Sequence, residues 1–197
     1  MRFRTCVGTL LLVGSLTACG SRTEGGGFHP SGKAPADGAS PGSSSSATSG
    51  AGGAVAGDGH PGVGTSAPKT PQSALAAYRG YQLAYEKAYE TNDASVLDPV
   101  AMDPLLTAVA KDIEAVRADG FIWRFHNAIN PRVQGNSDDG ATVVILDCLK
   151  TLGSYKFSAK TGRRISSWRG GTAQYQATMR YSSSIWKISD ATEGGKC

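Results

Sequence analysis

The residues Gly120-Phe121-Ile122-Trp123-Arg124-Phe125-His126 mark a change in the spacing of the apolar side chains. Before Gly120 the apolar residues recur every three or four positions, which is the period of an α-helix. After Gly120 they alternate, which is the period of a β-strand. Phe121, Trp123 and Phe125 then face one way, and the residues between them face the other. The chain is therefore predicted to form helices first and strands afterwards.

Two helices are predicted before this change. The first runs from residue 71 to about residue 91, because Thr70 can cap it and Pro71 suits a position where no backbone N–H is needed. The second starts after Asp103-Pro104, has apolar residues at helical spacing and ends at Gly120. A short turn or helix is expected between them, at residues 93–101.

The first helix carries four tyrosines at helical spacing along one face. Such a stripe either packs against a sheet with its hydroxyls at the edge or lines a ligand cavity. We favour packing from the sequence, and the cavity remains the alternative. The residues expected to line such a cavity are Tyr78, Tyr81, Tyr85, Trp123 and Tyr175.

About five antiparallel strands are expected after the helices. The strongly apolar residues 141–149 predict a central strand. Residues 155–159 and 164–168 predict a hairpin, and strands at 172–181 and 185–190 follow. Helices followed by antiparallel strands make an α+β fold with the helices packed on the sheet.

The N-terminus has the layout of a secretory signal. Two arginines precede an apolar run of about ten residues, which is too short to span a bilayer. Leu16-Thr17-Ala18-Cys19 then resembles the lipobox of bacterial lipoproteins, although an ordinary cleaved signal would share the layout without a cysteine. The resemblance implies a signal peptide at residues 1–18 and a lipidated Cys19. It implies a protein held at the extracytoplasmic face of the cell membrane, with its lipid as the membrane contact.

Residues 19–70 are predicted to be a disordered linker. They consist mainly of Gly, Ser, Ala and Pro, so they cannot bury enough apolar surface to offset the entropy of ordering the chain. This composition resembles that of envelope lipoproteins of high-GC Gram-positive bacteria. His29 and His60 lie here without neighbouring metal ligands, and we expect neither a metal nor a cofactor. The folded domain is expected at residues 71–197.

The charge of the predicted domain bears on its partners. Residues 71–197 carry 15 Lys and Arg against 13 Asp and Glu, a net charge of +2. That balance lacks the strong basic excess of a nucleic-acid-binding domain, so we expect no nucleic-acid partner.

The order helix, short helix, helix and antiparallel meander ends in Trp186-Lys187-Ile188. This order resembles the NTF2-like, or SnoaL-like, cone, in which helices close one side of a curved sheet and leave a conical pocket. The Asp147-Cys148 pair on a central strand, with Cys197 at the C-terminus, resembles secreted actinobacterial lipoproteins of that group. The resemblance covers residues 73–197. It also implies that a homodimer could form through the sheet.

The mature chain would contain Cys19, Cys148 and Cys197. With Cys19 acylated, two cysteines remain in an oxidising compartment, and a Cys148–Cys197 disulfide is the direct prediction. Two free thiols or a redox pair are the alternatives.

Enzymes of the NTF2-like group, such as ketosteroid isomerases and polyketide cyclases, need an acid or base inside the cone. The candidates are Asp147 and His126. Asp147 could instead accept backbone hydrogen bonds near the predicted disulfide. His126 shares a strand face with Arg124, which favours an exposed position. We favour these structural roles for both residues.

A basic patch flanks Trp168, and it consists of Lys160, Arg163, Arg164 and Arg169. It is either a solvated hairpin tip or a surface for anionic phosphates of the cell envelope. From the sequence we expect a non-catalytic binding or interaction module that recognises a small apolar ligand or a cell-envelope component. The alternative is a SnoaL-like or ketosteroid-isomerase-like enzyme.

Overall fold

The computed structural model describes residues 66–197. The predicted signal peptide, Cys19 and most of the predicted linker lie outside the described residues. The elements, in chain order, are α1 (Pro71–Thr91), a 3-10 helix η1 (Ala94–Leu97), α2 (Leu105–Ala118), β1 (Phe121–Ala128), β2 (Arg132–Asn136), β3 (Thr142–Ser158), β4 (Arg164–Arg169), β5 (Thr172–Ser182) and β6 (Ile185–Glu193). The predicted α+β order, with a short helix between two longer ones, is confirmed.

The N-terminus of α1 forms as its sequence predicts. The side chain of Thr70 accepts a hydrogen bond from the backbone N–H of Ser73 at 3.2 Å, and Pro71 occupies the first helical turn. The helix ends at Asn92, which adopts a left-handed conformation with φ of 52°. At the start of α2, a carboxylate oxygen of Asp103 accepts a hydrogen bond from the backbone N–H of Thr107.

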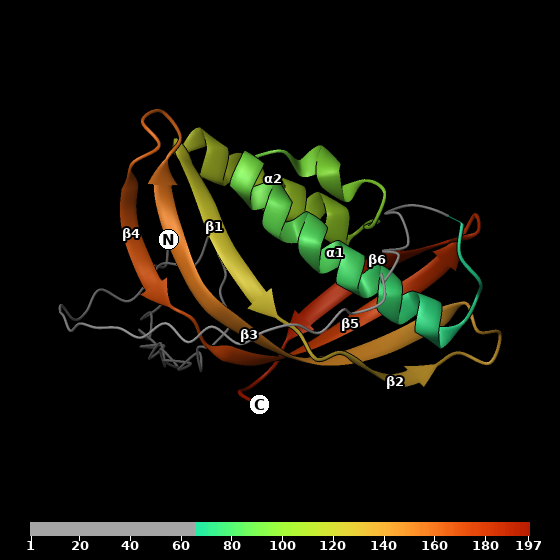
Figure 1. Cartoon of the computed structure of the whole chain (residues 1–197). Coiled ribbons are helices and arrows are strands. Elements are labelled where there is room, and N and C mark those ends of the chain that lie inside the picture. Colours follow the sequence, from blue (N-terminus) through green and yellow to red (C-terminus); the bar gives the residue numbers. More distant parts are fainter. Residues whose placement is uncertain (1–65) are drawn as a thin grey trace, which may run out of the picture.

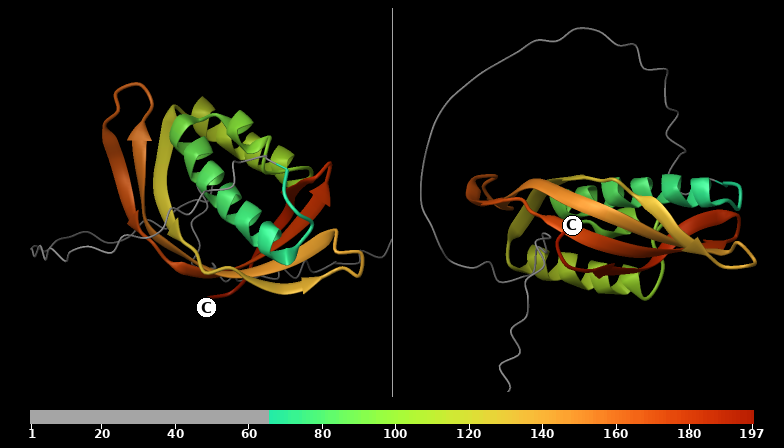
Figure 2. Two further views of the ribbon diagram at one scale, coloured as in Figure 1. Left: turned by 45° about the vertical axis from the view of Figure 1, so that its right-hand side comes forward. Right: turned by 90° about the horizontal axis from the view of Figure 1, so that it is seen from below.

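The sheet is organised around β3, a strand of 17 residues. One edge of β3 pairs with β2 and then with β1, and the other edge pairs with β5 and then with β4. β6 completes the sheet beside β5. Figures 1 and 2 show the sheet curling around the helices, which pack against its concave face.

The strands differ from the sequence prediction in two places. Residues 150–154 do not separate two strands, because β3 continues through them and pairs Lys150 with Ala128 and Thr151 with Asn127. β2 was not predicted, yet Val133 pairs with Ile145 in the apolar half of β3. Backbone pairing holds both segments, and it does not require the alternating apolar side chains that identify a strand in sequence.

A close backbone contact fixes the passage from β4 to β5. The chain crosses beside β3 at Gly170 and Gly171, and the N–H of Thr151 donates to the carbonyl of Gly171 at 2.9 Å. A β-carbon on Gly170 would lie 1.5 Å from the carbonyl oxygen of Thr151. Only glycine fits this crossing without a backbone shift.

The core lies between the helices and the concave face of the sheet. Its completely buried apolar side chains come from every layer of the fold. The largest are Tyr78, Tyr81, Tyr89, Leu97, Ile113, Ile145, Met179 and Ile188. No helix within residues 66–197 has both the length and the apolar character needed to cross a bilayer.

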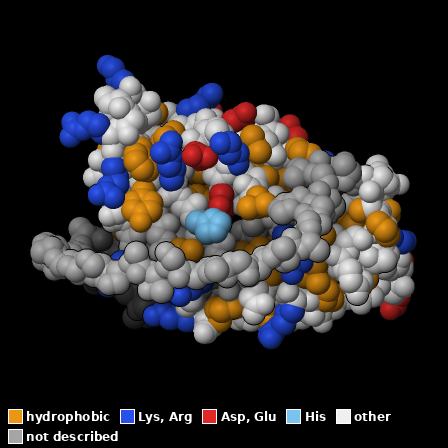
Figure 3. All heavy atoms as spheres, in the orientation of Figure 1, with side chains coloured by type: hydrophobic (Ala, Val, Ile, Leu, Met, Phe, Trp, Pro, Cys, Tyr) orange, Lys and Arg blue, Asp and Glu red, His pale blue; other side chains and the backbone are white. Residues whose placement is uncertain are grey.

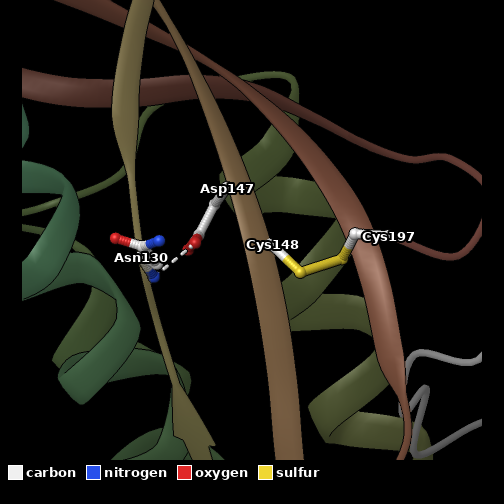
Figure 4. Close-up of a disulfide and its surroundings, with 4 residues drawn as sticks. All are labelled: Asn130, Asp147, Cys148 and Cys197. Atoms are coloured by element: carbon white, nitrogen blue, oxygen red, sulfur yellow. Dashed lines mark hydrogen bonds between the residues drawn. A yellow bond between two sulfur atoms is a disulfide. The ribbon is translucent and has the colours of Figure 1, made fainter.

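The chain before α1 and the C-terminal tail are both held on the sheet. Tyr181 donates a hydrogen bond from its hydroxyl to the carbonyl of Ala67. At the other end, the N–H of Gly194 donates to the carbonyl of Gln174 at 2.7 Å. The predicted disulfide then joins Cys197 to Cys148 on β3, across 49 residues of sequence (Figure 4).

Candidate functional site

Asp147 lies on β3 inside the cone, and its side chain is enclosed by the protein. Its residue exposure is 1%. The hydroxyl of Tyr78 donates to Oδ2 at 2.9 Å, and the backbone N–H of Asn130 donates to Oδ1 at 2.6 Å. Figure 4 shows the carboxylate turned toward Asn130, away from the neighbouring disulfide. Both carboxylate oxygens therefore have partners from the chain itself.

A hydrogen-bond chain joins this carboxylate to α1. The side-chain amide of Gln82 donates to the hydroxyl of Tyr78 at 2.9 Å, and Tyr78 donates onward to Asp147. Residues 78 and 82 are one helical turn apart, so both side chains reach the same point of the sheet. Burial, followed by the negative charge of Asp147, raises the pKa of Tyr78 far above its ordinary value. Tyr78 therefore keeps its proton and acts as a donor.

The environment of Asp147 acts on its pKa in two directions. Burial raises the pKa of this carboxyl above its ordinary value, because the charged form loses its hydration. The N–H of Asn130, the hydroxyl of Tyr78 and the positive charge of Arg79 oppose that shift. The net pKa stays raised. A raised pKa is a property of some catalytic acids, but it also occurs at structural buried carboxyls.

The other tyrosines of α1 pack as a layer against β1 and α2. Tyr85 contacts the ring of Tyr89 at a centroid distance of 4.9 Å and that of Phe125 at 5.7 Å, with edge-to-face geometry. The hydroxyl of Tyr89 donates to Asp112 on α2. These contacts support the packing interpretation of the tyrosine stripe for Tyr85 and Tyr89.

Tyr81 differs from its neighbours. Its hydroxyl is buried and has no hydrogen-bond partner within the described part of the chain. Tyr175, half-buried on β5, pairs with Asp147 in the β3–β5 ladder. Burial, followed by the charges of Glu193 and Asp190, raises the pKa of Tyr175 to about 12. Four of the five predicted lining residues, Tyr78, Tyr81, Tyr85 and Tyr175, thus lie close enough in the interior to act on one another's pKa.

The fifth predicted lining residue and the second catalytic candidate lie elsewhere. Trp123 contacts Trp168 of β4 at a centroid distance of 4.8 Å. His126 is exposed on the other face of β1, where Nδ1 lies 3.0 Å from a carboxylate oxygen of Glu86. The prediction of an exposed position for His126 is confirmed, and this residue cannot act with Asp147 in one interior site. No cluster of three His, Cys, Asp or Glu side chains suited to a metal occurs within residues 66–197.

A second candidate surface is the hairpin of β3 and β4, which extends beyond the helices (Figure 2). The sequence from Cys148 to Ser189 contains no Asp or Glu. Its eight basic residues are Lys150, Lys156, Lys160, Arg163, Arg164, Arg169, Arg180 and Lys187. Figure 3 shows Lys and Arg side chains gathered around apolar ones at this end of the molecule. The basic patch predicted from sequence is therefore one part of a longer basic segment.

Aromatic and apolar side chains lie among these charges, and sequence reasoning did not select them. Tyr155 is 41% exposed and Ile165 is 52% exposed. The guanidinium carbon of Arg164 lies 5.8 Å from the centroid of the Tyr155 ring. The Lys156 ammonium lies 3.6 Å from the centroid of Phe121 on the concave side. The long interval without acidic residues was visible in the sequence, but these side-chain contacts were not.

Comparisons with other proteins show the fold alone. No protein-family model and no curated protein matches this sequence. The intermembrane space region of the chloroplast protein ARC6 has a TM-score of 0.52 at 14% identity, covering 64% of this chain and 96% of that one. The described domain has the NTF2-like cone fold. Its helices on a curled antiparallel sheet are the arrangement that the sequence led us to expect.

Two solved structures with lower TM-scores have enzyme names. A dehydratase-like protein of the NTF2-like family from Streptomyces avermitilis has a TM-score of 0.46 at 12% identity, covering 64% of this chain and 99% of that one. A hexachlorocyclohexane dehydrochlorinase from Novosphingobium barchaimii has a TM-score of 0.44 at 11% identity, covering 62% of this chain and 86% of that one. At this similarity the activities of those proteins do not transfer to this chain.

Proposed function

We propose that this protein is a lipid-anchored component of a bacterial cell envelope, and that its NTF2-like domain is a non-catalytic binding module. One observation carries the proposal for the domain. Both oxygens of Asp147, the interior acid, accept hydrogen bonds from Tyr78 and Asn130. A general base must instead accept a proton from a substrate within hydrogen-bond reach. The domain is therefore better suited to binding a partner at its surface than to catalysis in its interior.

The cost of using Asp147 as a base supports the same proposal. Its partners would have to move, and a buried donor left without its acceptor costs about 1–3 kcal/mol. The amide of Asn130 belongs to the backbone and cannot rotate away as a side chain can. The bond from Tyr78 is itself supported by Gln82. This arrangement is suited to holding α1 against β3.

The proposed anchor rests on Cys19 and the sequence before it. A lipid-bearing Cys19, followed by a linker of about 50 residues with a root-mean-square span of roughly 40 Å, would hold the domain away from the membrane. A disulfide between Cys148 and Cys197 fits an extracytoplasmic location, because such bonds persist in oxidising compartments. The actinobacterial character of the leader and linker is part of this proposal.

Metabolic labelling with an alkyne fatty acid tests the anchor. The wild-type protein should incorporate the label into the membrane fraction, and Cys19→Ala should abolish incorporation. Cys6→Ala is a matched control, because Cys6 lies within the proposed signal peptide and should not affect labelling. Label retained in the Cys19→Ala variant would refute the anchor.

Native mass spectrometry of the full-length protein tests the binding module. We expect no small-molecule adduct on the protein as isolated, beyond its lipid anchor. Wild type and Asp147→Asn should then bind added envelope components equally. Loss of an activity on a small substrate in Asp147→Asn, without loss of folding, would contradict the non-catalytic proposal.

A second candidate function is binding of a small, mainly apolar ligand inside the cone. The hydroxyl of Tyr81 favours it, because a buried polar group without a partner usually meets water or a ligand. In this case native spectra would contain an added mass that disappears on denaturation. Tyr81→Phe would weaken binding of this ligand. Tyr89→Phe is the control, because the hydroxyl of Tyr89 already donates to Asp112.

A further inference from the structure

β4 lies at the edge of the sheet. It pairs with β3 along one side, and no other element within residues 66–197 pairs with its outer side. Figure 1 shows β4 as the outermost strand of the hairpin, standing clear of both helices. An unpaired strand edge presents a row of backbone N–H and C=O groups that can pair with another chain.

From this edge and its charge we propose that β4 binds an extended acidic segment of another envelope protein, which adds to the sheet as a further strand. The proposal rests on the binding-module function above and names its surface and partner. Strand addition of this kind draws affinity from backbone hydrogen bonds and specificity from the side chains beside them.

The side chains of the hairpin make its edge selective for acidic partners. Arg164 and Arg169 stand at the two ends of β4, and Lys160 and Arg163 extend the basic surface into the turn. All four are exposed, and none forms an ion pair within residues 66–197. Their charge is therefore available to carboxylates of a partner, and Arg can bind these with two parallel N–H groups.

Charge disfavours a second copy of this chain as the partner. An antiparallel β4–β4 pair centred between Ser166 and Ser167 would set Arg164 of each copy directly opposite Arg169 of the other. Like charges at directly opposed positions destabilise a strand pair. The arginines thus oppose self-association through this edge, and the same charges favour an acidic strand.

The backbone favours a polypeptide over an anionic polymer. A polyphosphate or a lipid surface would neutralise the cations but leave the row of N–H and C=O groups unpaired. An extended polypeptide satisfies both. The exposed Ile165 on the strand and Tyr155 beside it add apolar area that an alternating acidic and β-branched segment could cover.

The hairpin is held in place before any partner arrives. Trp168 on β4 pairs with Ser154 and packs its ring against Trp123 of β1. The glycine crossing at Gly170 fixes the end of the strand against Thr151. The chain enters the described domain beside the β5–β6 turn, where the backbone N–H of Ala67 donates to the carbonyl of Ser184. This turn is at the other end of the sheet from the hairpin. The edge therefore needs little ordering on binding and lies far from the attachment of the tether.

Peptide binding to the full-length oxidised protein in detergent micelles tests the proposal. The first probe is a ten-residue peptide of alternating Glu and Val, labelled with a fluorophore. The second has the same charge but carries N-methyl groups along its backbone, so it cannot pair as a strand. Inorganic polyphosphate and phosphatidylglycerol vesicles are the probes for a polymer and a membrane. Amide hydrogen exchange of residues 164–169 is followed with each.

The expected result is binding of the first peptide, with slowed exchange in β4, and at least about tenfold weaker binding of the N-methylated peptide. The double variant Arg164→Glu, Arg169→Glu should also lose at least about tenfold in affinity. The double variant Lys111→Glu, Arg132→Glu, with the same change in net charge at exposed positions outside the basic segment and β4, should bind as the wild type does.

Equal binding of the two peptides, or no binding of the first, would overturn strand addition. If polyphosphate or the vesicles then bound without protection of β4, the surface would be a general anion site and the binding-module function would stand. The binding-module function fails on a different result, which is Asp147-dependent turnover of a small substrate.

Discussion

The hydroxyl of Tyr78 donates a hydrogen bond to Oδ2 of Asp147 at 2.9 Å, although 69 residues separate the two in sequence. The bond joins α1 to the central strand β3. Its partners on either side, Gln82 and Asn130, complete a polar connection through the interior of the cone. The interior acid is thereby part of the packing of the domain.

Replacing Tyr78 with phenylalanine should destabilise the domain. The ring would still fill its place, but Oδ2 of Asp147 would lose its donor in a buried position, which costs about 1–3 kcal/mol. Chemical denaturation followed by fluorescence measures the free energy of unfolding. Tyr155→Phe is the control, because Tyr155 is 41% exposed and should change the free energy by less than about 0.5 kcal/mol. Equal effects of the two variants would contradict a structural role for the Tyr78–Asp147 bond.

Asp147→Asn should alter how stability depends on pH. Burial raises the pKa of Asp147 in the folded state, so the folded protein holds this proton more tightly than the unfolded chain. The stability of the wild type relative to the variant should therefore fall as pH rises from the ordinary carboxyl pKa, near 3.8, through the raised value. Denaturation midpoints measured across this window report the difference.

For Asp139→Asn, the difference in stability from the wild type should change with pH in the opposite direction. This variant therefore serves as the comparison. Hydrogen bonds from the Ser137 hydroxyl and then the Ala141 N–H lower the pKa of this exposed carboxyl. The stability of the wild type relative to Asp139→Asn should rise as pH rises through the lowered pKa toward the ordinary one. If the stability difference changed with pH in the same direction for both variants, the environments assigned to Asp147 and Asp139 would be wrong.

Removing the disulfide should loosen the C-terminal tail and destabilise the domain. Cys148 and Cys197 are 49 residues apart, and closing a loop of about this length contributes about 4 kcal/mol in the chain-entropy model. Cys148→Ser with Cys197→Ser should lower the unfolding free energy by about 2–4 kcal/mol. Reduced wild type should match the double variant, and a wild type whose stability does not respond to reductant would contradict the bond.

Gly170→Ala should disturb the passage from β4 to β5. The new β-carbon would overlap the backbone of Thr151, so the strand must shift, at a cost of about 3 kcal/mol. Gly135→Ala in β2 is the matched control, because nothing lies within 4 Å of its β-carbon position and its φ is not positive. Thermal unfolding of both variants measures the contrast. A Gly170→Ala protein as stable as Gly135→Ala would contradict the close approach.

The sequence predicted the larger part of the fold where local chemistry was strong. Thr70 and Pro71 began α1, Gly120 ended the helical region, and the alternation after Gly120 marked the first strand. The prediction failed between residues 150 and 154 and at β2. There the strand is held by pairing with distant segments, so its own side chains carry no clear pattern.

The sequence by itself determined the α+β order, the two cysteines able to pair and the basic character of the segment after Cys148. These follow from local spacing and composition, which act between neighbouring residues. Only the tertiary structure decided that Asp147 meets Tyr78 and Asn130, that His126 faces outward, and that β4 has an unpaired edge. Each of these depends on contacts between segments far apart in the chain, and the path of the curved sheet alone sets those contacts.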